Sequence, residues 1–205
     1  MIVKVCGMRE PENIRAVERA GADWMGFIFY ARSPRYVAAP PAYLPAACRR
    51  VGVFVNEPAD TVVQQAARFG LTHVQLHGRE TAEECRRLRA EGLTVIKAFS
   101  VKGSADAQAA TAYEGACDYF LFDTACTGYG GSGTSFDWRA LRAYGGQTPF
   151  LLSGGLRPDS LEALARFHHP RWAGIDLNSG FETAPARKDA AALKTFIEQA
   201  KQLEP

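Results

Sequence analysis

The sequence predicts an α/β fold, a closed (β/α)8 TIM barrel formed by a single domain over residues 1–205. Two observations support this prediction. Short β-branched and apolar runs alternate strictly with amphipathic helical patterns along the chain, which is typical of a parallel sheet. The alternation occurs eight times, and 205 residues divided by eight leaves about 26 per unit, which suits a short barrel of this class. An open, doubly wound sheet is the alternative.

The first unit shows the pattern most clearly. A strand is expected over residues 2–6, where β-branched and apolar side chains lead to Cys6 and then Gly7. A helix is expected over residues 11–20, because apolar residues recur there every three or four positions between a proline and a glycine. The second strand is expected over residues 24–29. Together these elements form a β–α–β unit.

The later elements are predicted on the same grounds. Residues 81–84 read Thr-Ala-Glu-Glu, a capping box that opens a helix, and residues 193–200 place apolar side chains on one stripe of the last helix. Further strands are expected at 51–55, 73–76, 94–99, 118–122, 149–152 and 172–177. Further helices are expected at 42–48, 61–69, 81–91, 105–113, 137–144, 158–167 and 188–201.

The composition argues against several kinds of partner. The net charge is only +2, so neither nucleic acid nor an anionic membrane is expected to bind. No apolar run approaches the roughly 20 residues of a membrane span, and the N-terminus lacks the pattern of a secretory signal, so we expect a cytoplasmic protein. The five cysteines are an odd number without metal-site spacing, which argues against a disulfide framework and a zinc site.

Candidate catalytic residues stand where strands end, because the active sites of such barrels lie at the C-terminal ends of the strands. Cys6 ends the first strand, and a thiol there could act as a base once it loses its proton, with Lys4 as a nearby cation. Asp123 ends the sixth strand before a glycine-rich loop, where partial desolvation would favour the protonated acid. The alternatives are a packed strand residue for Cys6 and a loop cap through Thr124 for Asp123.

Two small-residue turns follow the seventh and eighth strands. Ser153 precedes Gly154 and Gly155, and Asn178 precedes Ser179 and Gly180. Small residues leave backbone N–H groups accessible, and loops seven and eight are the usual phosphate site of these barrels. The sequence therefore predicts a phosphate cradle, with ordinary glycine turns as the alternative.

Two further loops have a pattern that suggests function. The loop 30–36 combines Arg32 and Arg35 with two tyrosines, which suits a carboxylate attached to an aromatic ring, unless it is simply a solvated basic loop. The segment 127–134 matches a GxGxxG pattern, but it follows the sixth strand and lacks the later acidic residue of a dinucleotide site. We expect it to be a mobile lid.

Taken together, these segments resemble the phosphoribosylanthranilate isomerases, barrel enzymes of tryptophan biosynthesis. The likeness covers nearly the whole chain in order, and no functional position departs from it; Asn178 stands where other members can carry serine. The most specific matching segments are Lys4-Val5-Cys6-Gly7-Met8, Val74-Gln75-Leu76-His77-Gly78, Phe122-Asp123-Thr124, Tyr129-Gly130-Gly131-Ser132-Gly133, Leu152-Ser153-Gly154-Gly155-Leu156 and Asn178-Ser179-Gly180-Phe181-Glu182.

The resemblance implies an Amadori rearrangement of N-(5-phosphoribosyl)anthranilate to 1-(2-carboxyphenylamino)-1-deoxyribulose 5-phosphate. It implies Asp123 as the general acid for the ribose ring oxygen and Cys6 as the general base for the C2 proton. Arg35 would bind the anthranilate carboxylate, while Gly154, Gly155, Asn178, Ser179 and Gly180 would hold the phosphate. The reaction includes no redox or group-transfer step, so neither a cofactor nor a metal is expected.

Two alternatives remain open at this point. One is the sister isomerase of histidine biosynthesis, which looks different because it carries aspartate in place of Cys6 and has a clearer two-fold repeat. The other is a non-catalytic sensor that binds a phosphorylated ligand. No expected helix has an unusually apolar outer face, so a monomer is expected rather than a homodimer.

Overall fold

The structure is a computed structural model that describes residues 1–124 and 138–203. Within these ranges eight parallel strands form a closed barrel in the order β1 to β8. The strands are β1 (Ile2–Val5), β2 (Trp24–Ile28), β3 (Arg49–Phe54), β4 (His73–Leu76), β5 (Thr94–Val101), β6 (Tyr119–Thr124), β7 (Phe150–Leu152) and β8 (Trp172–Leu177). The barrel prediction is confirmed, and the open sheet is wrong because β1 pairs with both β2 and β8.

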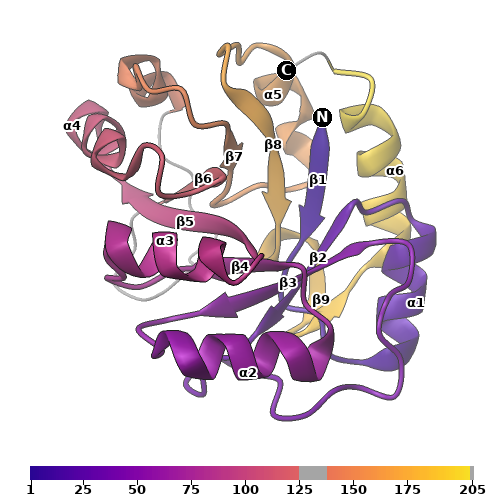
Figure 1. The fold of residues 1–205 in the computed structure, drawn as a ribbon. Helices are drawn as coiled ribbons and strands as arrows, with labels where there is room; N and C mark the ends of the chain where they lie inside the picture. Colours follow the sequence, from indigo (N-terminus) through magenta and orange to yellow (C-terminus); the bar gives the residue numbers. More distant parts are fainter. Residues whose placement is uncertain (125–137, 204–205) are drawn as a thin grey trace.

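Helices cover the outer face of the barrel (Figure 1). The α-helices are α1 (Pro11–Arg19), α2 (Ala59–Phe69), α3 (Ala82–Ala90), α4 (Ser104–Ala109), α5 (Leu161–Ala165) and α6 (Ala190–Ala200). The 3-10 helices are η1 (Ala110–Tyr113), η2 (Trp138–Ala143), η3 (Pro158–Ser160) and η4 (Ser179–Phe181). A small hairpin of β9 (Glu182–Ala184) and β10 (Arg187–Lys188) follows β8.

The barrel wall separates two apolar regions. Outward-facing strand residues pack with the helices in one large core, because successive side chains of a strand point to opposite faces. A smaller cluster has its own buried members. They are Trp24, Val51, Ile96, Ala98, Leu121 and Leu151. We assign this cluster to the inside of the barrel, since its members alternate with the residues that face the helices.

The expected helix over residues 42–48 is wrong. This segment, which the structure describes completely, contains no helix and runs as irregular chain with bends to β3. Pro45 in the middle of the segment lacks the backbone N–H that a helix needs. Instead, the Glu18 carboxylate on α1 accepts hydrogen bonds from the backbone N–H groups of Ala46 and Ala47, at 2.7 and 2.6 Å.

Several other helices differ in kind or extent from their predictions. The helix expected at 137–144 is a 3-10 helix over its described residues, and the one expected at 158–167 is a 3-10 turn followed by the five-residue α5. The last helix begins after residue 188, because Asp189 caps it by accepting hydrogen bonds from two backbone N–H groups. The capping box at Thr81 is confirmed.

None of the helices in the described ranges has the length and apolar character needed to cross a membrane.

Candidate active site

A cavity opens at the C-terminal ends of the strands. It encloses about 780 Å³, including space open to solvent. All eight residues to which the resemblance assigns a role line it, whereas Arg32 is exposed and is not part of the lining. The eight are Cys6, Arg35, Asp123, Gly154, Gly155, Asn178, Ser179 and Gly180. The fold therefore brings together, from five separate parts of the chain, the groups expected to form one site.

Cys6 follows β1 and is buried, with 3% of its surface exposed. Its backbone N–H donates to Leu177 O at 2.8 Å, which holds the residue against β8. Gly26 on β2 leaves the space that the sulfur occupies, because a Cβ there would lie 2.7 Å from Cys6 Sγ. Burial raises the pKa of the Cys6 thiol, and the nearby lysines Lys4 and Lys188 only partly offset this. Cys6 is therefore a thiol at neutral pH.

A buried ion pair lies beside Cys6. Lys4 is fully buried, and its Nζ lies 2.7 Å from Asp176 Oδ1. Asp176 also accepts a hydrogen bond from Ser153 Oγ at 3.3 Å. Burial disfavours the charged lysine, but Asp176 and Cys6 outweigh this and raise the pKa of Lys4. The result is a fixed positive charge close to the sulfur.

Asp123 stands at the end of β6, with 6% of its surface exposed. Its Oδ2 lies 3.5 Å from His77 Nε2, and His77 follows β4. Gln75 Nε2 lies 2.9 Å from His77 Nδ1. Both Gln75 and His77 also line the cavity, so one polar row leads along β4 to Asp123.

Arg35 is held by a carboxylate that the sequence reasoning missed. Its Nε and Nη2 donate to Glu182, with Nη2 to Oε2 at 2.6 Å. Lys188 Nζ contacts the same carboxylate at 2.5 Å and donates to Asn178 Oδ1 at 2.8 Å. Burial alone would raise the pKa of Glu182, but the bonds from Arg35 and Lys188 lower it. The loop after β2 is thus tied to the loop after β8.

The loops after β7 and β8 contact each other closely. Gly154 and Gly155 have φ angles of +82° and +70°, a conformation that side chains disfavour. A Cβ at Gly180 would lie 2.0 Å from the carbonyl oxygen of Leu156. Glycine is therefore required at this contact, which brings the two small-residue turns together at the rim of the cavity.

The comparisons with known proteins agree with this geometry. The sequence profile of the N-(5'phosphoribosyl)anthranilate (PRA) isomerase family matches residues 3–199. The chain belongs to this family. It is 67% identical over 202 residues to the N-(5'-phosphoribosyl)anthranilate isomerase of Phocaeicola vulgatus, which covers 98% of each chain. It is 51% identical to that of Parabacteroides distasonis, over 97% of this chain and 93% of the relative.

Solved structures of the family share the barrel. One is phosphoribosyl anthranilate isomerase in complex with reduced 1-(o-carboxyphenylamino)-1-deoxyribulose 5-phosphate, with a TM-score of 0.83, 35% identity and coverage of 99% and 100%. Another is a set of monomers generated from the dimeric Thermotoga maritima enzyme, with a TM-score of 0.84, 34% identity and the same coverage. This chain is accordingly an enzyme, an isomerase of tryptophan biosynthesis.

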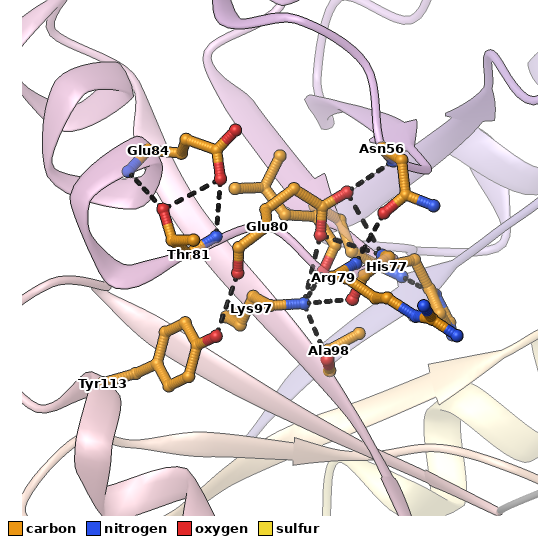
Figure 2. Close-up of polar contacts among 12 residues, drawn as sticks. Asn56, His77, Arg79, Glu80, Thr81, Glu84, Lys97, Ala98 and Tyr113 are labelled. Atoms are coloured by element: carbon orange, nitrogen blue, oxygen red, sulfur yellow. Dashed lines mark hydrogen bonds and ion pairs between the residues drawn. The ribbon is translucent and has the colours of Figure 1, made fainter.

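In this isomerase a second buried network supports the polar row on β4 (Figure 2). Lys97 Nζ donates to Leu76 O at 3.1 Å and to Gly78 O at 2.8 Å, the carbonyls on either side of His77. Its charge is balanced by Glu80, whose Oε2 lies 3.1 Å away. Glu80 Oε1 in turn accepts the backbone N–H of Asn56 at 2.7 Å. The end of β4 is thereby fixed from its outer side.

Sequence reasoning missed Glu182, Lys188 and the network around Lys97. A signal was present for Gln75, a polar residue between two apolar neighbours on a buried strand. No comparable signal marks Glu182 and Lys188, which lie in a hairpin that no periodicity predicts. The segment 127–134, expected as a lid, lies outside the described residues. In the described ranges no group of three His, Cys, Asp or Glu residues is placed to hold a metal ion.

Proposed function

We propose that the chain catalyses the Amadori rearrangement of N-(5-phosphoribosyl)anthranilate to 1-(2-carboxyphenylamino)-1-deoxyribulose 5-phosphate, with Asp123 as general acid and Cys6 as general base. The observation that carries the proposal is the shared cavity, which Cys6, Asp123, Arg35 and two glycine-rich turns all line. A relative with 35% identity binds the reduced form of this product.

The acid step begins at the ribose. Asp123 donates a proton to the ring oxygen, the bond from this oxygen to C1 breaks, and the nitrogen lone pair forms the C=N bond of a Schiff base. A carboxyl group suits this role because it is largely shielded from water, with 6% exposed, at the wall of the cavity.

The base step follows at C2. The Cys6 thiolate removes the C2 proton, and the resulting enolamine tautomerises to the ketone. Since burial raises the pKa of Cys6, the reactive thiolate is a minor form at neutral pH. Lys4 and Lys188 each favour it, because a nearby positive charge stabilises the thiolate.

The remaining groups bind the two ends of the substrate. Arg35 uses Nε and Nη2 for Glu182, so its Nη1 edge is available for the anthranilate carboxylate. Ile28, Val53 and Val55 line the same cavity and form an apolar wall for the aromatic ring. Gly154, Gly155, Asn178, Ser179 and Gly180 would hold the phosphate, through backbone N–H groups that small residues leave accessible.

The test is the decay of phosphoribosylanthranilate fluorescence on addition of the purified chain, repeated with Cys6→Ser and Asp123→Asn. Each variant should lose about 10²–10⁴-fold in turnover, the range of a positioned proton transfer. Each should still bind the reduced product. Near wild-type turnover in either variant would show that the assigned role is wrong.

The family match argues against both alternatives raised from the sequence, the non-catalytic phosphate-ligand sensor and the sister isomerase of histidine biosynthesis. The single-domain organisation, the monomeric state and the cytoplasmic location stay predictions from the sequence.

A further inference from the structure

The side-chain amide of Gln75 on β4 has its nitrogen hydrogen-bonded, while its oxygen has no partner among the described residues. The side chain is buried, with 1% of its surface exposed. Its Nε2 lies 2.9 Å from His77 Nδ1, while its Oε1 is buried without a hydrogen-bond partner among the described residues. A buried carbonyl without a partner is costly, so a second arrangement that pairs it is of interest.

The pairing determines where His77 carries its proton. An amide NH₂ can only donate, so Nδ1 must accept, and a neutral imidazole then carries its proton on Nε2. Nε2 lies 3.5 Å from Asp123 Oδ2. This arrangement suits an ionised Asp123, whereas a general acid must hold a proton before it reacts. The contact is longer than an ordinary hydrogen bond, as is common for catalytic groups without substrate.

We propose that His77 and Gln75 are positioning residues that hold the acid proton of Asp123, and that the Gln75 amide turns by half a rotation when this proton is loaded. In the loaded pair His77 carries a proton on Nδ1, which donates to Gln75 Oε1. The added proton lies between His77 Nε2 and Asp123 Oδ2. The inference rests on the proposed function, because it concerns the acid of that reaction.

The proton balance is simple. The loaded pair holds one proton more than the pair in the structure, and it takes this proton from solvent. On ring opening one proton leaves through the Asp123 carboxyl to the ribose oxygen. The proton left on His77 Nδ1 then exchanges with solvent, and Nε2 is reprotonated as the amide turns back. In each orientation of the amide, one of the two atoms Nε2 and Oε1 of Gln75 is hydrogen-bonded and the other is not. The two orientations therefore differ little in hydrogen-bond energy, and the amide can turn between them.

Other charged groups face or flank His77 and Asp123. Among the described residues, Cys6, Arg35 and Asp176 line the same cavity, and Lys97 and Glu80 flank His77 from the outer side of the barrel. Lys97 is neutralised by Glu80, Lys4 by Asp176, and Arg35 by Glu182. A substitution of Gln75 leaves these charged groups in place. A change in the pH–rate profile can therefore be assigned to the row formed by Gln75, His77 and Asp123.

The pH–rate profile separates this role from a structural one. The reactive form of the enzyme combines the Cys6 thiolate with the protonated pair of His77 and Asp123. Because the pKa of Cys6 is raised, the alkaline limb of the kcat/KM profile reports Cys6, and the acid limb reports the pair. The plateau then rises about tenfold for each pH unit by which the acid limb moves up.

The variants are Gln75→Glu and Gln75→Met. A carboxylate at position 75 stabilises the Nδ1 proton, so Gln75→Glu should move the acid limb up by about one pH unit and raise the plateau. Gln75→Met offers no comparable acceptor, so its limb should move down and its plateau should fall. The alkaline limb should stay fixed in both. Shifts in the same direction, or an unchanged acid limb in both variants, would overturn the proposal.

A measurement on the wild-type chain covers the case in which a variant does not fold. With ¹⁵N-labelled histidine and the reduced product present, His77 Nδ1 should change from a hydrogen-bond acceptor to a protonated donor when the acid proton is loaded at lower pH. An Nδ1 that remains unprotonated throughout would overturn the proposal. If the wild-type chain shows no turnover, the proposed function fails, whereas the ¹⁵N result still decides the inference.

Discussion

The ion pair under the active site makes the most demanding prediction. Lys4 is fully buried, Asp176 is 6% exposed, and their charged atoms are 2.7 Å apart. In Lys4→Met the Asp176 carboxylate would keep, among the described residues, only the hydrogen bond from Ser153 Oγ, at 3.3 Å. Removal of one partner of a buried pair typically costs about 3–5 kcal/mol. At about 2–4 °C per kcal/mol for a chain of this size, Tm should fall by roughly 6–20 °C.

The same substitution should lower activity separately from stability. Lys4 is the strongest of the groups that lower the pKa of Cys6, so its loss leaves burial less opposed and the thiolate rarer. Each unit by which the pKa of Cys6 rises reduces the thiolate fraction about tenfold at neutral pH. We therefore expect kcat/KM of Lys4→Met to fall at least about tenfold.

The double variant Lys4→Met/Asp176→Leu separates the two effects. An apolar pair can replace a buried ion pair with little loss of stability, so most of the lost Tm should return. Activity should stay below that of the wild type, because Cys6 still lacks its cation. Thermal unfolding followed by circular dichroism and the fluorescence assay at a temperature below both transitions measure these quantities. A Lys4→Met chain with wild-type Tm and wild-type kcat/KM would refute the reasoning.

Three further predictions concern single side chains. Gly26→Ala places a Cβ 2.7 Å from Cys6 Sγ, so kcat should fall at least about tenfold as the sulfur is displaced, and unchanged kcat would contradict this. Glu182→Gln weakens the bidentate support of Arg35, so KM for phosphoribosylanthranilate should rise about tenfold with a smaller change in kcat; an equal fall in kcat would argue against a binding role. Burial, with Arg49 adding to it, lowers the pKa of His73 from 6.5 to about 4. Between these values the unfolded chain binds the extra proton, so stability should be full above about pH 6.5 and fall by about 1–2 kcal/mol, after allowance for solvent screening, as pH drops toward 4. Urea unfolding near pH 7.5 and 4.5 tests this, and His73→Phe should remove that part of the loss.

The sequence was sufficient for the strands and for the groups at their ends. Short apolar runs that stop at Cys6, at Asp123 and at Ser153 indicate strands, and a parallel barrel places all such ends on one rim. The cavity therefore contains all eight residues to which the resemblance assigns a role.

Local pattern was weakest where tertiary contacts compete with it. Residues 42–48 have helical composition at several positions, but Glu18 on α1 takes two of their backbone N–H groups and the segment forms no helix. The last helix begins after the predicted residue because Asp189 caps it and Lys188 is used to bind Asn178 and Glu182. Such contacts depend on distant parts of the chain and leave no periodic signal.

By itself the sequence predicted the closed barrel, the location of the candidate site and the residues proposed for proton transfer, because strands follow from local periodicity and the candidates stand at strand ends. Only the tertiary structure decided which charges meet. Lys4 and Asp176 lie 172 positions apart, and closure of β1 against β8 makes them neighbours. Burial then decides the protonation of Cys6: from sequence Lys4 would favour the thiolate, but loss of water outweighs the cation and keeps the proton on sulfur.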